Sequence, residues 1–277
     1  MLDPDPSPGS HDVVPETVAG PAVLLGQELS QPLAEPDTAP FPTSRVKAIL
    51  AHCLVLARPA TGADRALLAA LVLADGVMIA SYVAFAYAEH YAIRGSLFYG
   101  NLNFSFVDGG YPESYGYGKQ VLVALLLLAT HAATRQAVYR MLALLFAVCV
   151  LDDSLALHEA FGSFMAAHAG IPVRVGELVG WGLIGLAPVL AVLAGYRRSD
   201  ARSRADAEAV LAGFAILLFF AVGMDVVHGV IGRFVSGFQT VLTIAEDGGE
   251  LFALTLICAL ALGIFRRRKA SAADAAA

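Results

Sequence analysis

Long apolar segments constrain this 277-residue chain more than any other feature. Six runs dominated by apolar residues follow one another along the sequence, at about 66–92, 117–134, 141–161, 177–196, 208–230 and 244–265. A transmembrane helix needs about 20 mostly apolar residues, and each run comes close to that length or exceeds it. Only 15% of the residues are charged, against about 25% in soluble domains. We therefore expect an all-α fold, a polytopic membrane helix bundle with about six transmembrane helices.

The basic residues predict how this bundle is oriented. With the N-terminus inside, fourteen of the eighteen Lys and Arg residues fall in inner segments, and four fall in outer ones: Arg94, Lys119, Arg174 and Arg233. Lys and Arg collect near the cytoplasmic ends of membrane spans. We therefore expect a multi-pass protein of the cell inner membrane with both termini in the cytoplasm.

The segments outside the spans differ sharply in composition. Residues 1–44 hold nine of the thirteen prolines and no Lys or Arg, so we expect a disordered acidic tail. Residues 45–65 include an apolar run too short to span, which predicts a cytoplasmic interfacial segment. Residues 66–265 form the six-helix transmembrane domain. Residues 266–277 are basic and then Ala-rich, which predicts a cytoplasmic tail.

Ionisable residues gather at one depth of the predicted membrane, its outer half. The third span carries LDDSLALHE, the fifth carries GMDVVH and the sixth opens with EDGGE. Bare carboxylates packed together in a low dielectric must bind protons, bind a cation or line water. His with Asp or Glu from neighbouring helices is a ligand set for zinc, iron or manganese. The residues that we expect as metal ligands are His158, Asp225, His228, Asp152, Glu250 and Glu246.

Helical spacing supports one shared site. Asp152 and Glu159 are seven residues apart and would share a face of a continuous helix, as would Asp225 with His228 and Glu246 with Glu250. The acids of the third and fifth spans lie toward helix C-termini, where negative charge is unfavourable, and this favours a functional role.

Several of these polar residues also have a structural explanation. Thr243 and Glu246 fit a capping box at the start of the last span, so its acids could simply serve that helix end. The pair Gly248–Gly249 fits either a loosely started helix with exposed carbonyls or a plain packing contact. Asp75, midway along the first span, is expected to make an interhelical hydrogen bond.

Three segments resemble a family of uncharacterised bacterial multi-pass membrane proteins. They are VDGGYPESYG, LDDSLALHE and EDGGEL, and the resemblance covers about 66–265. The matching positions are Asp108, Pro112, Asp152, Asp153, His158, Glu159, Glu246, Asp247, Gly248 and Glu250. Asp153 stands where the family pattern L-D-E-x(4)-H-E has Glu. A looser similarity, in ligand types alone, links the chain to intramembrane zinc hydrolases of the ceramidase and receptor-like type. Their Ser and HxxxH motifs do not occur here.

Two classes of function remain open at this point. One is a metal-dependent hydrolase or oxidase acting on a lipid, with zinc or iron (calcium as the alternative) and with Glu159 and Asp153 as catalytic residues. The other is a cation or proton channel or transporter, or a structural membrane subunit. Arg233 is the main rival to a metal for compensating the acids. The partners expected are membrane lipids and a homo- or hetero-oligomer; no basic stripe with interleaved aromatics predicts nucleic acid.

Overall fold

The computed structural model describes residues 43–107, 109–224, 226–227 and 239–274, and within them every regular element is helical. The elements are, in chain order, α1 (Thr43–Ala57), α2 (Gly62–His90), the 3-10 helix η1 (Leu102–Phe104), α3 (Tyr111–Thr134), α4 (Ala137–Leu155), α5 (Leu157–Ala169), α6 (Val173–Arg197), α7 (Ala201–Leu218), the π-helix η2 (Phe219–Met224) and α9 (Gln239–Asp274). The tail expected over 1–44 lies outside the described residues except for its last two, which already belong to α1.

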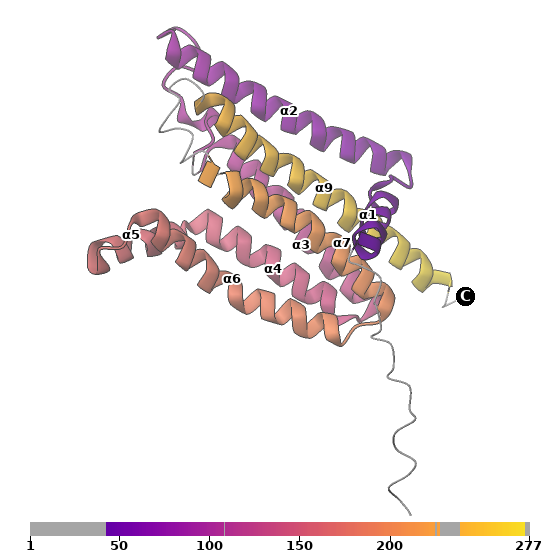
Figure 1. The fold of residues 1–277 in the computed structure, drawn as a ribbon. Coiled ribbons are helices and arrows are strands. Elements are labelled where there is room, and N and C mark those ends of the chain that lie inside the picture. The colour runs from indigo at the N-terminus through magenta and orange to yellow at the C-terminus, as the bar shows by residue number, and fades with distance from the viewer. Residues whose placement is uncertain (1–42, 108, 225, 228–238, 275–277) are drawn as a thin grey trace, which may run out of the picture. The chain divides into compact units, whose positions relative to one another are not determined.

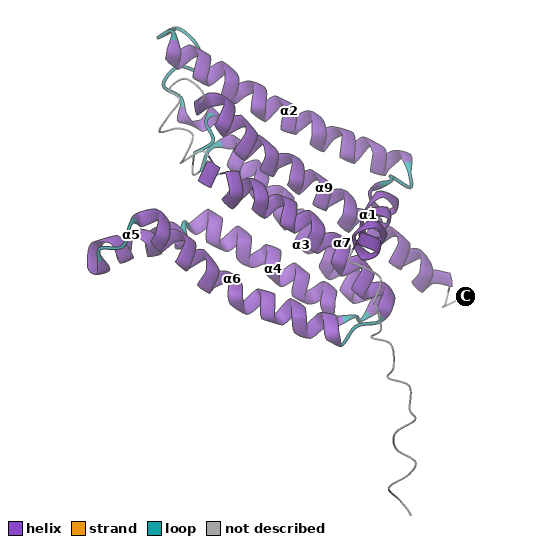
Figure 2. Ribbon diagram, viewed as in Figure 1, coloured by secondary structure: helices purple, strands orange, loops and turns teal. Residues whose placement is uncertain are grey.

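The long helices run back and forth between two ends of a bundle (Figure 1). Helix α1, the start of α2 and the end of α9 lie at one end, called here the α1 end. The connections that follow α2 and α4 lie at the other end, together with α5, and this is called the α5 end (Figure 2). The successive long helices α2, α3, α4, α6, α7 and α9 thus alternate in direction.

Length and composition make several of these helices candidate membrane spans. Four are long and apolar enough to cross a membrane, namely α2, α6, α7 with η2, and α9. The pair α4 and α5 makes a fifth if it counts as one span, although it bends by 56°. Helix α3 is not among them, because Lys119 and Gln120 lower its apolar character. The expectation of a membrane helix bundle is confirmed, while the number six stays a prediction.

The apolar core explains why α3 belongs inside the bundle. Val123 and Leu127 of α3 are fully buried, as are Phe146 of α4 and Ile257 of α9. Helices α4 and α9 pack along α3 from two sides. Within a bilayer, lipid is as apolar as these side chains, so close van der Waals packing rather than removal from water stabilises this core.

A buried ion pair joins α2, α3 and α9 within this core. Lys119 Nζ donates to Asp75 Oδ1 at 2.7 Å, to the Leu251 carbonyl at 2.6 Å and to Thr255 Oγ1 at 3.4 Å. Thr255 Oγ1 donates in turn to Asp75 Oδ2 at 2.6 Å, and the Tyr115 ring lies 4.5 Å from Lys119 Nζ. The interhelical role expected for Asp75 is confirmed. Lys119, placed by the sequence in an outer segment, instead lies buried between helices.

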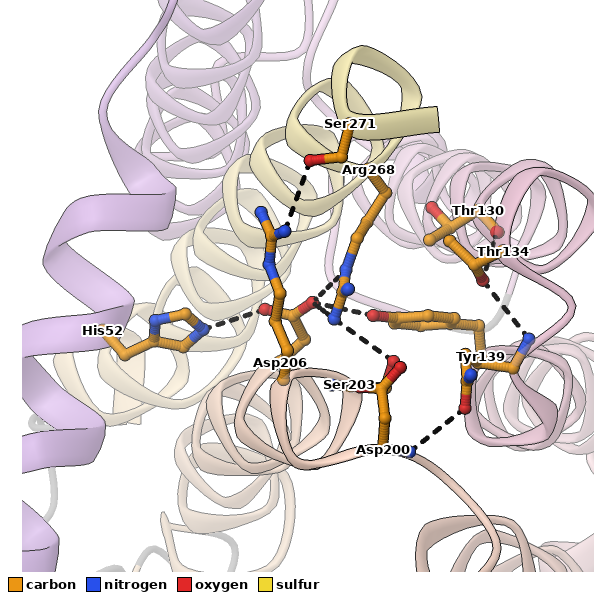
Figure 3. A network of polar contacts seen from close by, with 11 residues as sticks. His52, Thr130, Thr134, Tyr139, Asp200, Ser203, Asp206, Arg268 and Ser271 are labelled. Atoms are coloured by element: carbon orange, nitrogen blue, oxygen red, sulfur yellow. Dashed lines mark hydrogen bonds and ion pairs between the residues drawn. The ribbon is translucent and has the colours of Figure 1, made fainter. Parts of the chain in front are cut away.

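A second polar network closes the α1 end around the buried Asp206 of α7 (Figure 3). Arg268 of α9 contacts its Oδ2 through Nε at 2.9 Å and Nη2 at 2.7 Å. Tyr139 of α4 donates to the same oxygen at 2.7 Å, and His52 of α1 lies 2.9 Å from Oδ1. One carboxylate therefore ties four helices together. Residues 266–277 were expected to be a cytoplasmic tail, but the described part continues α9 to Asp274 and buries Arg268.

Helix α1 is fixed to the bundle by packing as well as by His52. Leu56 is 1% exposed. A Cβ added at Gly263 of α9 would lie 2.1 Å from the carbonyl oxygen of Leu56. Only glycine allows this close approach. Arg45 adds an exposed ion pair with Glu208 at 2.6 Å, and that neighbouring carboxylate raises the pKa of Arg45.

Two helix boundaries differ from the prediction and change the site. The span expected over 141–161 is not one helix, because α4 ends at Leu155 and α5 starts at Leu157. Asp152 and Glu159 therefore lie on different helices and do not share a face. Helix α9 already includes Gln239, so Thr243 and Glu246 lie inside it and form no capping box at its start.

Candidate functional site

A large acidic cavity lies among α3, α4, α5, α6, α7, η2 and α9, toward the α5 end. Its volume is about 1050 Å³. Among the described residues its walls carry one arginine, Arg174, one histidine, His158, and seven carboxyl side chains: Glu113, Asp153, Glu159, Glu177, Glu246, Asp247 and Glu250. Acids that the sequence predicted at one depth of the membrane therefore line a single cavity.

The bend between α4 and α5 builds the polar centre of this cavity. Ala156 adopts left-handed backbone angles, with φ at +48°, and ends α4. This turn brings His158, at the start of α5, back onto the last turn of α4. Asp152, Asp153 and His158 then offer ligand atoms that lie within 4.8 Å of one another, close enough to hold one metal ion. A left-handed alanine costs about 1 kcal/mol or more, so the rest of the fold must hold the bend.

Asp152 fixes the position of His158. Its Oδ1 accepts the backbone N–H of His158 at 3.0 Å, and its Oδ2 lies 3.1 Å from His158 Nδ1. The carboxylate of Asp152 thus compensates the N-terminus of α5, where negative charge is favourable. In one continuous helix over 141–161 it would have met only the C-terminal end, where negative charge is unfavourable. The other ring nitrogen, Nε2, points toward Glu159, whose Oε1 is 3.8 Å away.

Asp153 contacts α3 from the same turn of α4. The amide nitrogen of Gln120 donates to Asp153 Oδ2 at 3.1 Å, and Tyr117 donates to the Asp153 carbonyl at 3.2 Å. The amide oxygen of Gln120 is buried and has no hydrogen-bond partner among the described residues. An unsatisfied buried acceptor costs about 1–3 kcal/mol, so this oxygen marks a place where a donor or a cation would fit.

Helix α9 supplies the opposite wall with Glu246, Asp247 and Glu250. The two glycines between them allow close packing: an added Cβ at Gly249 would lie 2.2 Å from the Phe220 ring, and one at Gly248 would lie 3.2 Å from Ile79. Of the two explanations for this pair, the packing contact is the one that the geometry supports.

The predicted site residues therefore fall into two groups. Asp152, Asp153, His158, Glu159, Glu246 and Glu250 all lie at the cavity or directly behind it. Asp225 and His228 lie outside the described residues, as does Arg233, the expected rival to a metal.

Two cavity residues were missed from the sequence, Glu113 and Gln120 of α3. Both follow a regular pattern, since Glu113, Gly116, Tyr117 and Gln120 all line the cavity at spacings of three, four and seven. This signal was present in the sequence. The span predicted over 117–134 leaves Glu113 outside, whereas α3 begins at Tyr111 with Pro112 in its first turn.

Comparison with known proteins places the chain in a family without assigning it a reaction. Neither the curated proteins nor the solved structures include one that matches it. One family model does match, a domain of unknown function, over residues 66–264, which run from the first turns of α2 into α9. The chain therefore belongs to the family defined by the domain DUF8692.

Proposed function

We propose that this protein binds a divalent metal ion in the acidic cavity, through Asp153 and His158. The observation that carries the proposal is the cluster of Asp152, Asp153 and His158 beside the unsatisfied oxygen of Gln120. A cation there would compensate the negative cavity and give the amide oxygen a partner.

Of the three clustered residues, two are the proposed metal ligands and the third holds one of those ligands in place. Asp153 and His158 line the cavity, whereas Asp152 does not and is 2% exposed. A metal-binding histidine commonly donates its second ring nitrogen to a carboxylate, which fixes its tautomer and orientation. Asp152 has this relation to Nδ1 of His158, which leaves Nε2 for the metal. Glu159, Glu250 and Glu246 are the nearby carboxylates that would complete the coordination.

Mixed nitrogen and oxygen ligands favour zinc or iron over calcium, which prefers oxygen alone. Such an ion would supply a water of lowered pKa, and Glu159 is placed beside His158 to accept its proton. The proposed reaction class is metal-dependent hydrolysis. An oxidase would use the same carboxylate-rich ligands with iron.

A binding site accounts for the geometry better than a continuous ion pathway does. Toward the α1 end, the fully buried side chains of Val123, Leu127 and Phe146 occupy the interior. The Asp75–Lys119 pair near them is complete in itself. A pair that satisfies its own polar groups favours a closed binding site over a continuous ion path.

The proposal includes a six-span topology in the cell inner membrane. Helix α3 would be the sixth span, because its polar residues Lys119 and Gln120 find partners inside the bundle rather than facing lipid. The basic residues Arg266, Arg267 and Arg268 near the end of α9 support the proposal that both termini lie in the cytoplasm, because Lys and Arg collect on that side of a membrane. The cavity would then lie in the outer half of the membrane.

The test is the metal content of the purified protein, measured by elemental mass spectrometry. We expect close to one zinc or iron ion per chain, lost in His158→Ala and retained in the control His168→Ala. His168 is a matched control because it is exposed and its hydrogen bond and ring stacking both involve Phe164 of its own helix. Asp152→Asn should weaken binding by about 10–100-fold without abolishing it.

Two results would contradict the metal site. One is a metal content at background level in the wild-type protein. The other is equal content in the wild type and His158→Ala. If Arg233 compensates the acids instead, Arg233→Ala should be the destabilising change, and a chelator should have no effect on thermal stability.

A further inference from the structure

The first helix, α1, carries an apolar surface that the bundle does not cover. Its contacts with the other described helices go to α7 and α9, and His52 and Leu56 lie on the face that makes them. Beside that face lie Val46, Leu50 and Leu54, each more than half exposed. Side chains four residues apart lie above one another on a helix, so these three form one stripe. Large apolar side chains repeated along a stripe indicate an apolar neighbour.

Three cations lie along this stripe or at its end, and they are called here the basic border: Lys47, Arg58 and Arg267. Lys47 lies seven residues before Leu54, on the same side of the helix, and Arg58 directly follows the last residue of α1. Both are exposed. Arg267 reaches the same end of α1 from α9, where its Nη2 donates to the Val55 carbonyl at 2.8 Å.

The acids at this end of the bundle are engaged by other cations. Each forms an ion pair at 2.6–3.1 Å with a residue outside the basic border: Glu208 with Arg45, Asp64 with Arg266, and Asp206 with Arg268. Within the described part of the chain, no ion pair joins Lys47, Arg58 or Arg267 to a carboxylate. The positive charge of the basic border is therefore available to an anion from outside the bundle.

The place and direction of α1 agree with a position at the membrane surface. Helix α1 crosses α9 where Leu56 meets Gly263, two residues before the end of the span predicted over 244–265. Figure 1 shows α1 nearly end-on, although the long helices run across the same view, so α1 runs crosswise to them. An amphipathic helix with this direction, at the end of a span, suits the boundary between headgroups and acyl chains.

We propose that α1 lies in the bilayer interface with its apolar stripe among the acyl chains, and that its basic border binds the phosphate of an anionic phospholipid. This inference goes beyond the proposed function and needs no metal. Arginine binds phosphate through two parallel N–H donors, and lysine binds it as a point charge. An anionic phospholipid offers acyl chains to the stripe and a phosphate to the cations, whereas a soluble anion offers nothing to the stripe.

A tryptophan placed on the stripe would report the lipids next to α1. In Leu50→Trp with Trp181→Phe, the single tryptophan of the full-length chain lies on α1. The protein would be reconstituted in phosphatidylcholine vesicles that contain a small fraction of a lipid with brominated acyl chains, which quench tryptophan fluorescence nearby. We expect brominated phosphatidylglycerol to quench at about one-tenth of the mole fraction that brominated phosphatidylcholine needs.

Removing a cation should reduce this preference. Each Lys or Arg near an anionic surface strengthens binding by about fivefold, so Lys47→Gln and Arg58→Gln should each lower the preference by about that factor. Arg140→Gln is the matched control, because Arg140 is an exposed cation on α4, a helix that α1 does not contact. It should leave the preference unchanged. All three variants should melt at the temperature of the parent protein, which shows that they are folded.

Three results would overturn the proposal. The first is equal quenching by the two lipids in the parent protein, which is also the result expected if the acidic segment 1–42 covers the cations instead. The second is a preference that stays the same in both Lys47→Gln and Arg58→Gln, or that falls equally in Arg140→Gln. The third is loss of the preference in excess inorganic phosphate but not in potassium chloride of the same ionic strength, since the site would then bind a free anion. None of these results bears on the metal content, which tests the proposed function separately.

Discussion

The buried pair of Asp75 and Lys119 offers the sharpest test of how this bundle is held together. Both side chains are inaccessible to solvent, at 0% and 1% exposure. We consider Lys119→Met, which keeps the length and apolar stem of the side chain and removes its charge. Asp75 then keeps only the hydrogen bond from Thr255, and an uncompensated carboxylate remains between α2, α3 and α9.

The expected cost follows from these remaining contacts. Removing one partner of a buried ion pair typically costs 3–5 kcal/mol, because the other charge is left without compensation. The short hydrogen bond from Thr255, at 2.6 Å, stays in place, so we expect the lower part of that range, about 3 kcal/mol. For a domain of this size that loss lowers the melting temperature by about 6–12 °C.

The measurement is thermal unfolding of the purified protein in one detergent, with Asp75→Leu, Lys119→Met and the double variant compared. The double variant leaves no buried charge at this place and should recover to within about 1–2 kcal/mol of the wild type. Thr130→Val is the control, since Thr130 is fully buried on α3 but donates only to the Leu126 carbonyl of its own helix. Single variants that unfold like the wild type, or a double variant no more stable than the worse single one, would refute the charge-compensation argument.

The remaining predictions concern the bend, the α1 end and the topology. Ala156→Gly should stabilise the protein by about 1 kcal/mol, because glycine relieves the left-handed backbone; a lower melting temperature would contradict this. His52→Ala should cost about 1 kcal/mol in thermal unfolding, whereas Arg268→Leu should cost about 3 kcal/mol because it leaves Asp206 buried without its cation; equal losses would contradict the network. A reporter fused after Arg268 should be active only in the cytoplasm, and a periplasmic signal would contradict the proposed orientation.

The sequence predicted the membrane bundle because the constraint behind it is local and strong. Within a bilayer the backbone must satisfy its own hydrogen bonds, so a long apolar run has few alternatives to a helix. The depth of an acid along a predicted span is also a local property. Asp153, His158 and Glu250 could therefore be placed at one level before any helix was packed, and the structure gathers them around one cavity.

The sequence did not reveal the bend that builds the metal cluster. Nothing in VLDDSLALHE marks a helix end, since Ala156 is a strong helix former and no glycine or proline is nearby. The break is instead held by longer-range contacts. A Cβ added at Gly176 of α6 would lie 2.8 Å from the Cα of Gly162 of α5, so the two helices pack closely there, and Asp152 accepts the backbone N–H of His158 in the first turn of α5. Tertiary packing here overrides a local preference, and no spacing rule along one helix could have found it.

Polar groups are satisfied to different degrees in different parts of the described chain. Toward the α1 end and in the middle of the bundle, buried acids face cations: Asp206 faces Arg268, Asp64 faces Arg266, and Asp75 faces Lys119. At the cavity, Asp152, Asp153 and His158 lie within 4.8 Å of one another, and the buried amide oxygen of Gln120 has no hydrogen-bond partner among the described residues. Because an unsatisfied buried acceptor costs about 1–3 kcal/mol, a cation bound at this cluster would stabilise the fold, whereas the Asp75 and Asp206 networks are already complete. This contrast is the reason why we propose the function for the cavity rather than for either polar network.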